Sequence, residues 1–482
     1  MNLYAVVLGI IVVTLLGVSL ARLGKVKTKA DYLVAGRSLP AFVLVFTLLS
    51  SWIGSGSLLG GAENAYRHGF AALWQGGGGW AGLALIYFIA PRARKFAQFT
   101  IPDLLEARYN QAARVLGVIA VLFTYTAITS YQFIGGGDIL HLIFPQVSAV
   151  NGAYILAGFV IVFTAIAGMG SVAYMDVVIG VLATLTMLAA LPVLIHLAGG
   201  WEGVHAVLPD THFEVFGDIT PIQALELFLP TCLLMLGNQS MYQKFFSAKT
   251  EKDATRATVG WIIGTVILES VIVAIAVVGS ALFRSGEVHD RPREILAYTA
   301  IHAFGGAMAG NRVLGMLGAL LVGAIFAKVV STANNYLFSP ATNLVNDVFA
   351  RYVMKDASNT MIVWVSRGMV VILGLWALVQ ALKITSVLKM SLYAYTIYSA
   401  ALTPVILAAF YWKRATAAGA VSSIAAGTVV TVCWQYVAPY LPKVIGERDA
   451  ILPALLASLL GLFVVSLLTE KPSAEKLAPF AG

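Results

Sequence analysis

Thirteen long apolar segments run through this chain from one end to the other. They are residues 3–20, 40–66, 70–90, 113–141, 150–168, 174–198, 222–242, 258–283, 312–338, 360–382, 386–412, 415–438 and 450–469. Since a helix needs about 20 apolar residues to cross a bilayer, each segment is predicted to span the membrane. With 59% hydrophobic and only 11% charged residues, the composition predicts an all-α membrane protein and excludes a soluble enzyme.

The placement of Lys and Arg predicts the orientation of these spans. More than twice as many basic residues lie in the segments expected inside the cell as in those expected outside. The N-terminus is therefore expected outside and the C-terminus in the cytoplasm, in a multi-pass protein of the inner (cytoplasmic) membrane. The net charge of +8 is mostly this cytoplasmic excess, so no nucleic-acid partner is expected.

The sequence holds no pattern typical of a metal centre or of catalysis. The two cysteines, Cys232 and Cys433, lie in apolar segments and predict no disulfide, and the seven histidines lack metal-ligand spacing. Nucleotide-binding and hydrolase motifs are absent from the sequence. We therefore expect neither an enzyme nor a cofactor, apart from a coupling ion.

Lys328 lies near the middle of an apolar segment that reads GAIFAKVVSTANNYLFSP from Gly323 to Pro340. Ser331 and Thr332 share one helical face with this lysine. A charge at the centre of a lipid-spanning helix costs roughly 2.5 to 3.5 kcal/mol, so it normally faces a partner or an internal pathway. The alternatives are a lysine that snorkels to the interface, about 15 Å away, and a structural ion pair.

Two of the spans contain helix-breaking sequences. Residues 50–57 read SSWIGSGS, and residues 237–240 read GNQS within the seventh span, after Pro230. Broken helices five spans apart are typical of an inverted repeat around a central site, because unwound backbone at that depth has to line a cavity. Close packing of small residues is the alternative, and Asn238 and Gln239 favour a site.

Several segments resemble the sodium:solute symporter family, which carries proline, sugars, sialic acid, choline and pantothenate. The most specific are ADYLVAGRSLP (30–40), TIPDLLEARYN (100–110), GNQSMYQKFFSAKTEKDATRA (237–257) and STANNYLFSPATNLVNDVF (331–349). The resemblance covers nearly the whole chain. It implies one transporter domain over 1–482, with a LeuT-type five-plus-five inverted repeat in 40–412. An extra helix in 1–23 precedes this core, two helices in 413–469 follow it, and 470–482 form a short cytoplasmic tail.

The resemblance also implies an ion site. The sodium ligands of the family fall on the backbone carbonyls of Ser50, Ile53 and Lys328 and on the hydroxyls of Ser331 and Thr332. Five oxygens suit a hard cation. Relatives typically have a small residue at position 328, and an ammonium about 4 Å from a sodium ion would repel it by about 4 kcal/mol at an effective dielectric constant of 20. We therefore hypothesise that the Lys328 ammonium replaces sodium.

Asp176 is the expected counterpart of Lys328. By family resemblance it lines the inner half of the pathway, some two turns inward of the lysine, as an inner ion site or proton relay. A lysine that alternates between this carboxylate and the serine hydroxyls could move a proton in each cycle. The same two residues could instead form a fixed bridge. The sequence leaves open the choice between proton coupling and ion-independent transport.

The resemblance places solute contacts on the first broken helix, the next span, the fourth span and the seventh. They are Trp52, Ser55, Gly56, Ser57, Gln75, Tyr131, Gln132, Asn238 and Tyr242. Sugar-carrying relatives have Asn and Glu where this chain has Trp52 and Gly76. Trp52 could bind an onium group or serve only in packing, and Lys328 favours a solute with a carboxylate or a zwitterion.

The predicted function is alternating-access transport of a small polar organic solute through the lipid bilayer. The first alternative is a conventional sodium symporter in which Lys328 is turned away. The second is a membrane sensor or channel on the same scaffold that does not transport. The sequence does not predict the solute or the oligomeric state.

Overall fold

The computed structural model describes residues 3–23, 28–89, 100–284, 287–305 and 311–480. Within these ranges, nine helices are long and apolar enough to cross a membrane, or ten if the bent pair Ala41–Trp52 and Gly56–Ile86 counts as one span. A helix occupies each of the thirteen expected segments. The number of true crossings stays a prediction.

The longer helices account for most of the bundle. They are α1 (Leu3–Leu23), α3 (Ala41–Trp52), α5 (Leu73–Ile86), α8 (Gln111–Ile143), α9 (Ala149–Ile166), α10 (Met169–Leu197), α12 (Pro221–Gly237), α14 (Glu251–Leu282), α15 (Ile295–Gly305), α16 (Arg312–Asn343), α17 (Asn359–Ala381), α18 (Val387–Ala401), α20 (Ala417–Val437) and α22 (Ile451–Leu468).

Shorter helical elements connect or extend them. They are α2 (Lys29–Val34), η1 (Ala35–Arg37), η2 (Gly56–Gly61), α4 (Ala62–His68), η3 (Gly69–Ala72), α7 (Ile101–Arg108), α11 (Gly200–Val207), η4 (Asp210–Phe213), α13 (Gln239–Ser247), η5 (Glu287–His289), η6 (Pro292–Glu294), η7 (Leu344–Val353), α19 (Thr403–Tyr411), η8 (Ala438–Tyr440), α21 (Lys443–Gly446), α23 (Ala474–Leu477) and η9 (Ala478–Phe480).

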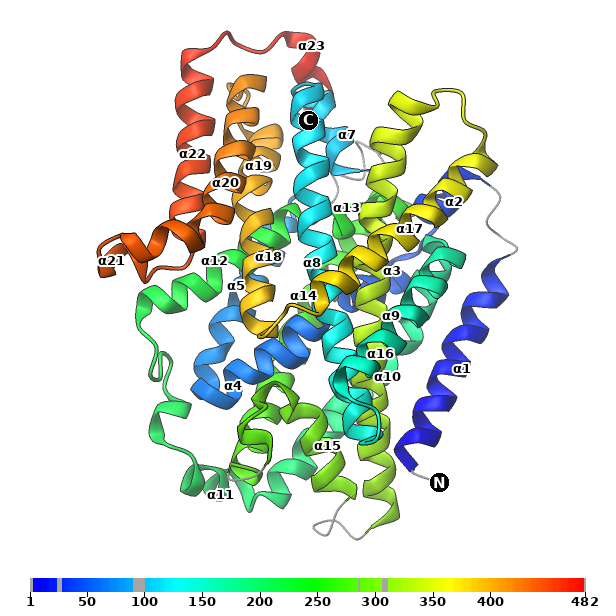
Figure 1. Cartoon of the computed structure of the whole chain (residues 1–482), viewed down its shortest axis with the longest axis vertical. Helices are drawn as coiled ribbons and strands as arrows, with labels where there is room; N and C mark the ends of the chain where they lie inside the picture. The colour runs from blue at the N-terminus through cyan, green and yellow to red at the C-terminus, as the bar shows by residue number, and fades with distance from the viewer. Residues whose placement is uncertain (1–2, 24–27, 90–99, 285–286, 306–310, 481–482) are drawn as a thin grey trace.

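The two ends of the bundle carry different short elements. Figure 1 shows α11 and α15 at the end where the N-terminus lies, and α7 and α23 at the opposite end with the C-terminus. The charges of segment 284–311 predict an outer segment that folds over the mouth of the bundle. In the structure this segment holds η5, η6 and α15, and η6 packs against α4. The two acids and the arginine of TIPDLLEARYN predict an amphipathic linker, and this stretch holds α7, which Thr100 caps.

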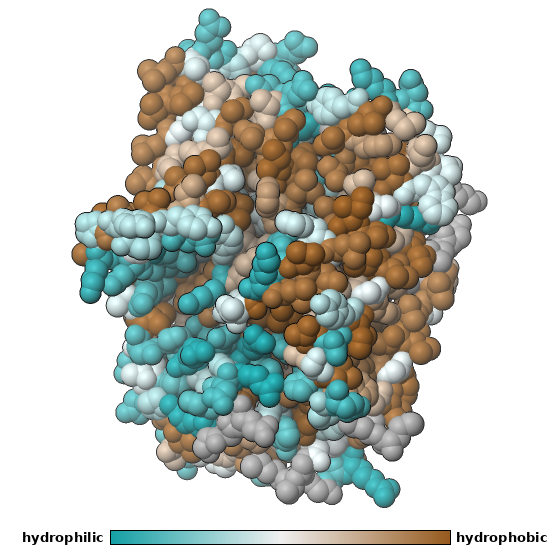
Figure 2. Space-filling view, in the orientation of Figure 1, coloured by the Kyte–Doolittle hydropathy of each residue, from teal (hydrophilic) through white to brown (hydrophobic). Residues whose placement is uncertain are grey.

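The inner helices place α3 between two long neighbours. α10 packs on α3 and on α16, α14 packs on α3 from another side, and α8 packs on α16. The outer flanks are apolar: Trp364, Leu185 and Val162 on α17, α10 and α9 are each at least 60% exposed. Figure 2 shows hydrophobic residues over much of the visible flank and hydrophilic ones gathered toward its lower part. Hydrocarbon is the environment that such flanks require.

The sixth expected span begins earlier than the sequence predicted. Hydrophobicity placed its start at residue 174, whereas α10 begins at Met169, next to the extended residue Gly168. Asp176 therefore lies about two turns into the helix rather than near its first turn. This places its side chain deeper among α3 and α16 than the sequence indicated.

Candidate functional site

The first broken helix has the interruption predicted from its glycines and serines. α3 ends at Trp52, and the chain resumes as a helix at Gly56 after a bend of 56°. Two glycines permit close approach there. A Cβ on Gly54 would lie 2.5 Å from Thr332 Oγ1, and one on Gly56 would lie 2.4 Å from the Tyr395 hydroxyl. A larger residue at either position would force α16 or the Tyr395 side chain of α18 to shift away from the break.

The second predicted break is also present. α12 ends at Gly237 and α13 begins at Gln239, with Asn238 extended between them. The Asn238 side-chain oxygen accepts from the backbone N–H groups of Ser240 at 3.0 Å and Met241 at 3.4 Å, which caps α13. The break thus follows from an asparagine that satisfies the first free donors of the next helix.

The structure brings four of the five predicted ion-site oxygens together. Thr332 Oγ1 lies 2.8 Å from the carbonyl oxygen of Ser50, 3.3 Å from that of Ile53 and 3.0 Å from that of Lys328. The fifth, the hydroxyl of Ser331, donates to the carboxylate of Asp176 instead. The cluster joins the end of α3 to the middle of α16.

Lys328 points into this cluster rather than toward lipid. Its side chain is fully buried, and Nζ donates to Ser50 Oγ at 3.1 Å. Ser50 Oγ in turn lies 3.4 Å from the backbone carbonyl of Asp176. In the described part of the chain, Lys328 reaches Asp176 through this hydroxyl rather than through a direct ion pair.

Asp176 is held by uncharged donors from two helices. Thr47 Oγ1 donates to Oδ2 at 2.5 Å, Asn335 Nδ2 donates to Oδ2 at 3.2 Å, and Ser331 donates to Oδ1. The carboxylate is completely buried. A buried carboxylate needs such donors and a nearby positive charge to keep its own charge.

A second buried lysine, Lys244, is linked to the side-chain carboxylate of Asp176. Lys244 on α13 donates to Asn335 Oδ1 at 2.9 Å and to Ser240 Oγ at 3.0 Å, so Asn335 bridges Lys244 and Asp176. Lys244 follows the seventh expected span, 222–242, by two residues, and in the structure its side chain is fully buried. Its spacing of four from Ser240 on one helical face was the available signal.

A small cavity beside the first break collects part of the predicted solute site. Its lining includes Trp52, Ser57 and Gln75, together with Glu269 and Tyr395. It leaves about 20 Å³ for the centre of a water molecule, which is room for about one water. A solute can therefore enter only when the surrounding helices move.

Two more predicted residues adjoin this cavity without lining it. Gly56 packs against the Tyr395 hydroxyl, and the Tyr131 hydroxyl lies 3.3 Å from the same oxygen. Ser55 and Gln132 instead bind each other, since the backbone N–H of Ser55 donates to Gln132 Oε1 at 2.8 Å.

Asn238 and Tyr242 lie apart from the residues that line the cavity. Asn238 belongs to a tyrosine cluster, in which it accepts from the Tyr125 hydroxyl at 2.7 Å and donates to that of Tyr336 at 2.9 Å. The Tyr242 hydroxyl donates to the carbonyl of Leu236 at 3.0 Å, within its own broken helix. The structure thus divides the nine predicted solute residues between separate groups.

Sequence reasoning missed Glu269, the acidic group of the cavity. Trp52 Nε1 donates to Oε1 at 2.6 Å and Trp80 Nε1 donates to Oε2 at 2.7 Å. The signal was present, because Glu269 is an acid inside the apolar segment 258–283, and the argument used for Lys328 applies to it equally.

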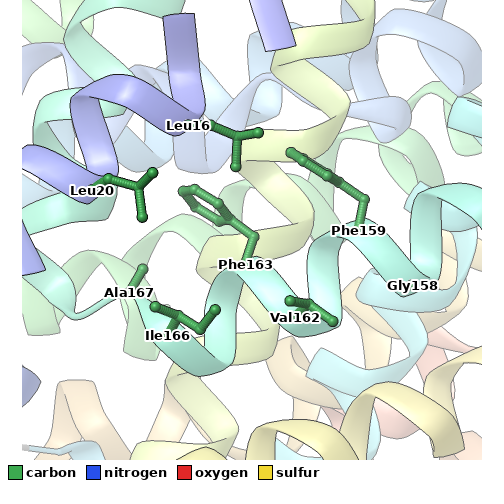
Figure 3. A pocket seen from close by; sticks show the side chains of 8 residues that line it. All are labelled: Leu16, Leu20, Gly158, Phe159, Val162, Phe163, Ile166 and Ala167. Atoms are coloured by element: carbon green, nitrogen blue, oxygen red, sulfur yellow. The ribbon is translucent and has the colours of Figure 1, made fainter. Parts of the chain in front are cut away.

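A larger hollow lies between α1 and α9 (Figure 3). Leu16 and Leu20 of α1 face Phe159, Phe163 and their neighbours on α9 across it. Every residue that lines it is apolar or glycine, and the edge residue Val162 is 60% exposed. It offers no polar group to a solute and fits hydrocarbon.

Two broken helices that meet buried charged clusters inside a lipid-facing bundle define a secondary active transporter. The model of the sodium:solute symporter family matches residues 32–427, and the chain belongs to this family. Known proteins agree with this assignment. The sodium/proline symporter of Staphylococcus aureus is 26% identical over 467 residues, which is 92% of this chain and 88% of that protein.

Solved structures share the fold. A Na⁺-coupled sialic acid symporter, in a substrate-bound outward-open state, matches with a TM-score of 0.76 at 16% identity, covering 98% of this chain and 99% of that one. Mhp1, a nucleobase-cation-symport-1 family transporter, matches with a TM-score of 0.56 at 14% identity, covering 94% and 99%. The fold is therefore LeuT-like, and the family supports a symporter of a small molecule in a membrane rather than a catalyst.

Proposed function

We propose that this chain moves a small polar organic solute across the cytoplasmic membrane by alternating access, with the Lys328 ammonium in place of the sodium ion of its relatives. The observation that carries the proposal is the position of Lys328 Nζ, 3.1 Å from Ser50 Oγ. The backbone carbonyl of the same serine is one of the three that Thr332 Oγ1 contacts. The N-terminus outside, thirteen spans and a five-plus-five inverted repeat belong to the same proposal.

Charge repulsion is the physical reason. A sodium ion at the carbonyls of Ser50 and Ile53 would lie close to the Lys328 ammonium. At about 4 Å and an effective dielectric constant of 20, the repulsion is about 4 kcal/mol, which lowers affinity by nearly three orders of magnitude. The lysine already places one positive charge at the hydroxyl of Ser50, whose carbonyl is one of these ligands.

Asp176 completes the proposed coupling device. Lys328 reaches it through Ser50, and Lys244 reaches it through Asn335. A lysine that exchanges Ser50 for the carboxylate could carry a proton in each cycle. Without proton release, the same movement would allow ion-independent transport, and uptake across a range of pH separates these two modes.

Thermal unfolding in detergent tests the sodium replacement without knowledge of the solute. We expect the wild type to unfold at the same temperature in NaCl and in KCl of equal ionic strength. Lys328→Ala removes the competing charge, so NaCl should raise its unfolding temperature by a few degrees, because a ligand of the folded state stabilises it. Lys389→Ala, which changes an exposed lysine, should behave as the wild type.

A conventional sodium symporter is the alternative, favoured by the sodium that is named in the relatives and by the retained oxygens of Ser331 and Thr332. It requires Lys328 to move away from Ser50. Under that mechanism NaCl would stabilise the wild type at least as much as Lys328→Ala.

A further inference from the structure

Glu269 is a buried carboxylate near the middle of α14. Its residue is 6% exposed, and the helix runs over 32 residues from Glu251 to Leu282. A carboxylate at such depth is costly in a membrane unless a positive charge or a cavity accompanies it. The side chains around Glu269 therefore indicate whether its carboxylate has a structural partner or binds a ligand.

The partners of Glu269 are all neutral. Its two oxygens accept from the indole N–H groups of Trp52 and Trp80, at 2.6 and 2.7 Å, and Ser57 Oγ lies 3.5 Å from Oε1. Among the described residues, no Lys, Arg or His forms an ion pair with it. By contrast, Asp138 in the same bundle has the Arg293 guanidinium at 2.8 Å. The indole groups fix the direction of the Glu269 carboxylate but leave its charge uncompensated.

The remaining walls of the cavity suit a cation. The rings of Trp52 and Tyr395 are stacked with centroids 5.9 Å apart, and aromatic faces attract ammonium groups. On another side, Gly76 lacks a side chain where a Cβ would lie 3.1 Å from Glu269 Oε2. Oε2 accepts from Trp80 but has no side chain over it on the Gly76 side, where a group that enters from the cavity can approach it.

We infer that the transported solute carries a positively charged amino group and that Glu269 binds this group, with Trp52 and Trp80 orienting the carboxylate. The inference rests on the proposal that the chain transports a solute through this cavity. It narrows the substrate class to compounds with a protonated or quaternary amino group, which include amino acids and other zwitterions. The solute itself then supplies the positive charge that the protein omits at this position.

Matched pairs of compounds test the inference by thermal unfolding of the full chain in detergent. The pairs are L-proline with cyclopentanecarboxylate, L-alanine with L-lactate, and choline with 3,3-dimethyl-1-butanol. We expect stabilisation only by the amine or onium member of a pair. Glu269→Gln should weaken that binding at least roughly tenfold, since a charge-assisted contact is lost. Glu269→Asp should restore part of the binding.

Glu226→Gln is the control. Glu226 is an acid of α12, also buried, that binds the backbone N–H of Asp449 and does not line the cavity. The unliganded unfolding temperature of each variant shows whether it folds. The inference is overturned if a neutral or anionic member binds as well as its partner, if no amine stabilises the wild type, or if Glu269→Gln retains the affinity. Failure of the sodium proposal would appear separately, as stabilisation of the wild type by NaCl.

Discussion

Two buried carboxylates flank the first broken helix, and their surroundings differ in one respect. Asp176 meets α3 through Thr47. Lys244 is linked to its carboxylate through Asn335, and Lys328 is linked to its backbone carbonyl through Ser50. Glu269 meets the same helix through Trp52 and has only neutral donors. We propose that an ion from solution is not needed where the chain supplies its own cation, and that the cation arrives with the solute where the chain supplies none.

Removal of the Asp176 charge should have the largest effect. Asp176→Asn leaves Lys328 and Lys244 buried without a counter-charge, which typically costs about 3 to 5 kcal/mol. We expect uptake into proteoliposomes to fall to background and the unfolding temperature to drop. Adding Lys328→Met should recover part of the lost stability. An Asp176→Asn protein with unchanged stability and uptake would refute the role of Asp176 as the counter-charge of the two lysines.

Gly54 lies in the first broken helix, against Thr332 of the predicted ion site. Gly54→Ala places a Cβ 2.5 Å from Thr332 Oγ1, so α16 has to shift, and overpacking of this kind costs about 1 to 3 kcal/mol. We expect roughly tenfold slower uptake and a lower unfolding temperature. Gly77→Ala is the matched control, because nothing lies within 4 Å of its new Cβ. Equal effects of the two changes would show that the contact with Thr332 is unimportant.

Lys244 and Lys328 need not compensate the charge of Asp176 to the same extent. Lys244→Gln keeps two donors for Asn335 and Ser240 but removes the charge. Since Lys328 remains, we expect uptake to fall only several-fold. Uptake into proteoliposomes by Lys244→Gln and by Asp176→Asn, measured in parallel, checks this. A loss as complete as that of Asp176→Asn would make Lys244 the main counter-charge and weaken the role of Lys328.

The smallest effect on stability should come from Glu294 in the charged segment 284–311, which contacts neither Asp176 nor Glu269 in the described part of the chain. Burial, and to a smaller extent the charge of Asp138, raises the pKa of Glu294 to about 7, although Arg291 pairs with it at 3.3 Å. A raised pKa means that the folded protein keeps this proton in a range where the unfolded chain has lost it. Stability from this source is present at low pH and is lost as the pH rises from about 4.5 to about 7.

Unfolding temperatures of the wild type and Glu294→Gln check this sign. The advantage of the wild type over the variant should shrink between pH 5 and pH 8. A difference that grows over this range would mean that the ion pair with Arg291 outweighs burial.

The sequence predicted the breaks and the lysine face because both depend on local chemistry. Glycines and serines before Ser57, and Asn238 after Gly237, weaken or cap helices wherever they occur. Lys328 stands out because a charge inside an apolar helix always requires a partner.

The partners themselves could not be predicted in the same way. Glu269 takes one of its donors from Trp52, 217 positions away, and hydrophobic periodicity carries no information on such pairings. Trp52 was expected at the solute site only through the family resemblance, and nothing in the sequence connected Trp52 or Trp80 with Glu269. The start of α10 was missed because Gly168, Gly170 and Ser171 are typical of a loop between two apolar segments.

Sodium dependence of transport tests the central claim most directly. Proteoliposomes with the wild-type protein are loaded with buffer, and uptake of an amine identified in the matched-pair screen is measured in NaCl and in KCl at one pH. We predict equal rates in the two salts for the wild type and faster uptake in NaCl for Lys328→Ala. Steep stimulation of the wild type by sodium would contradict the replacement of the ion by Lys328.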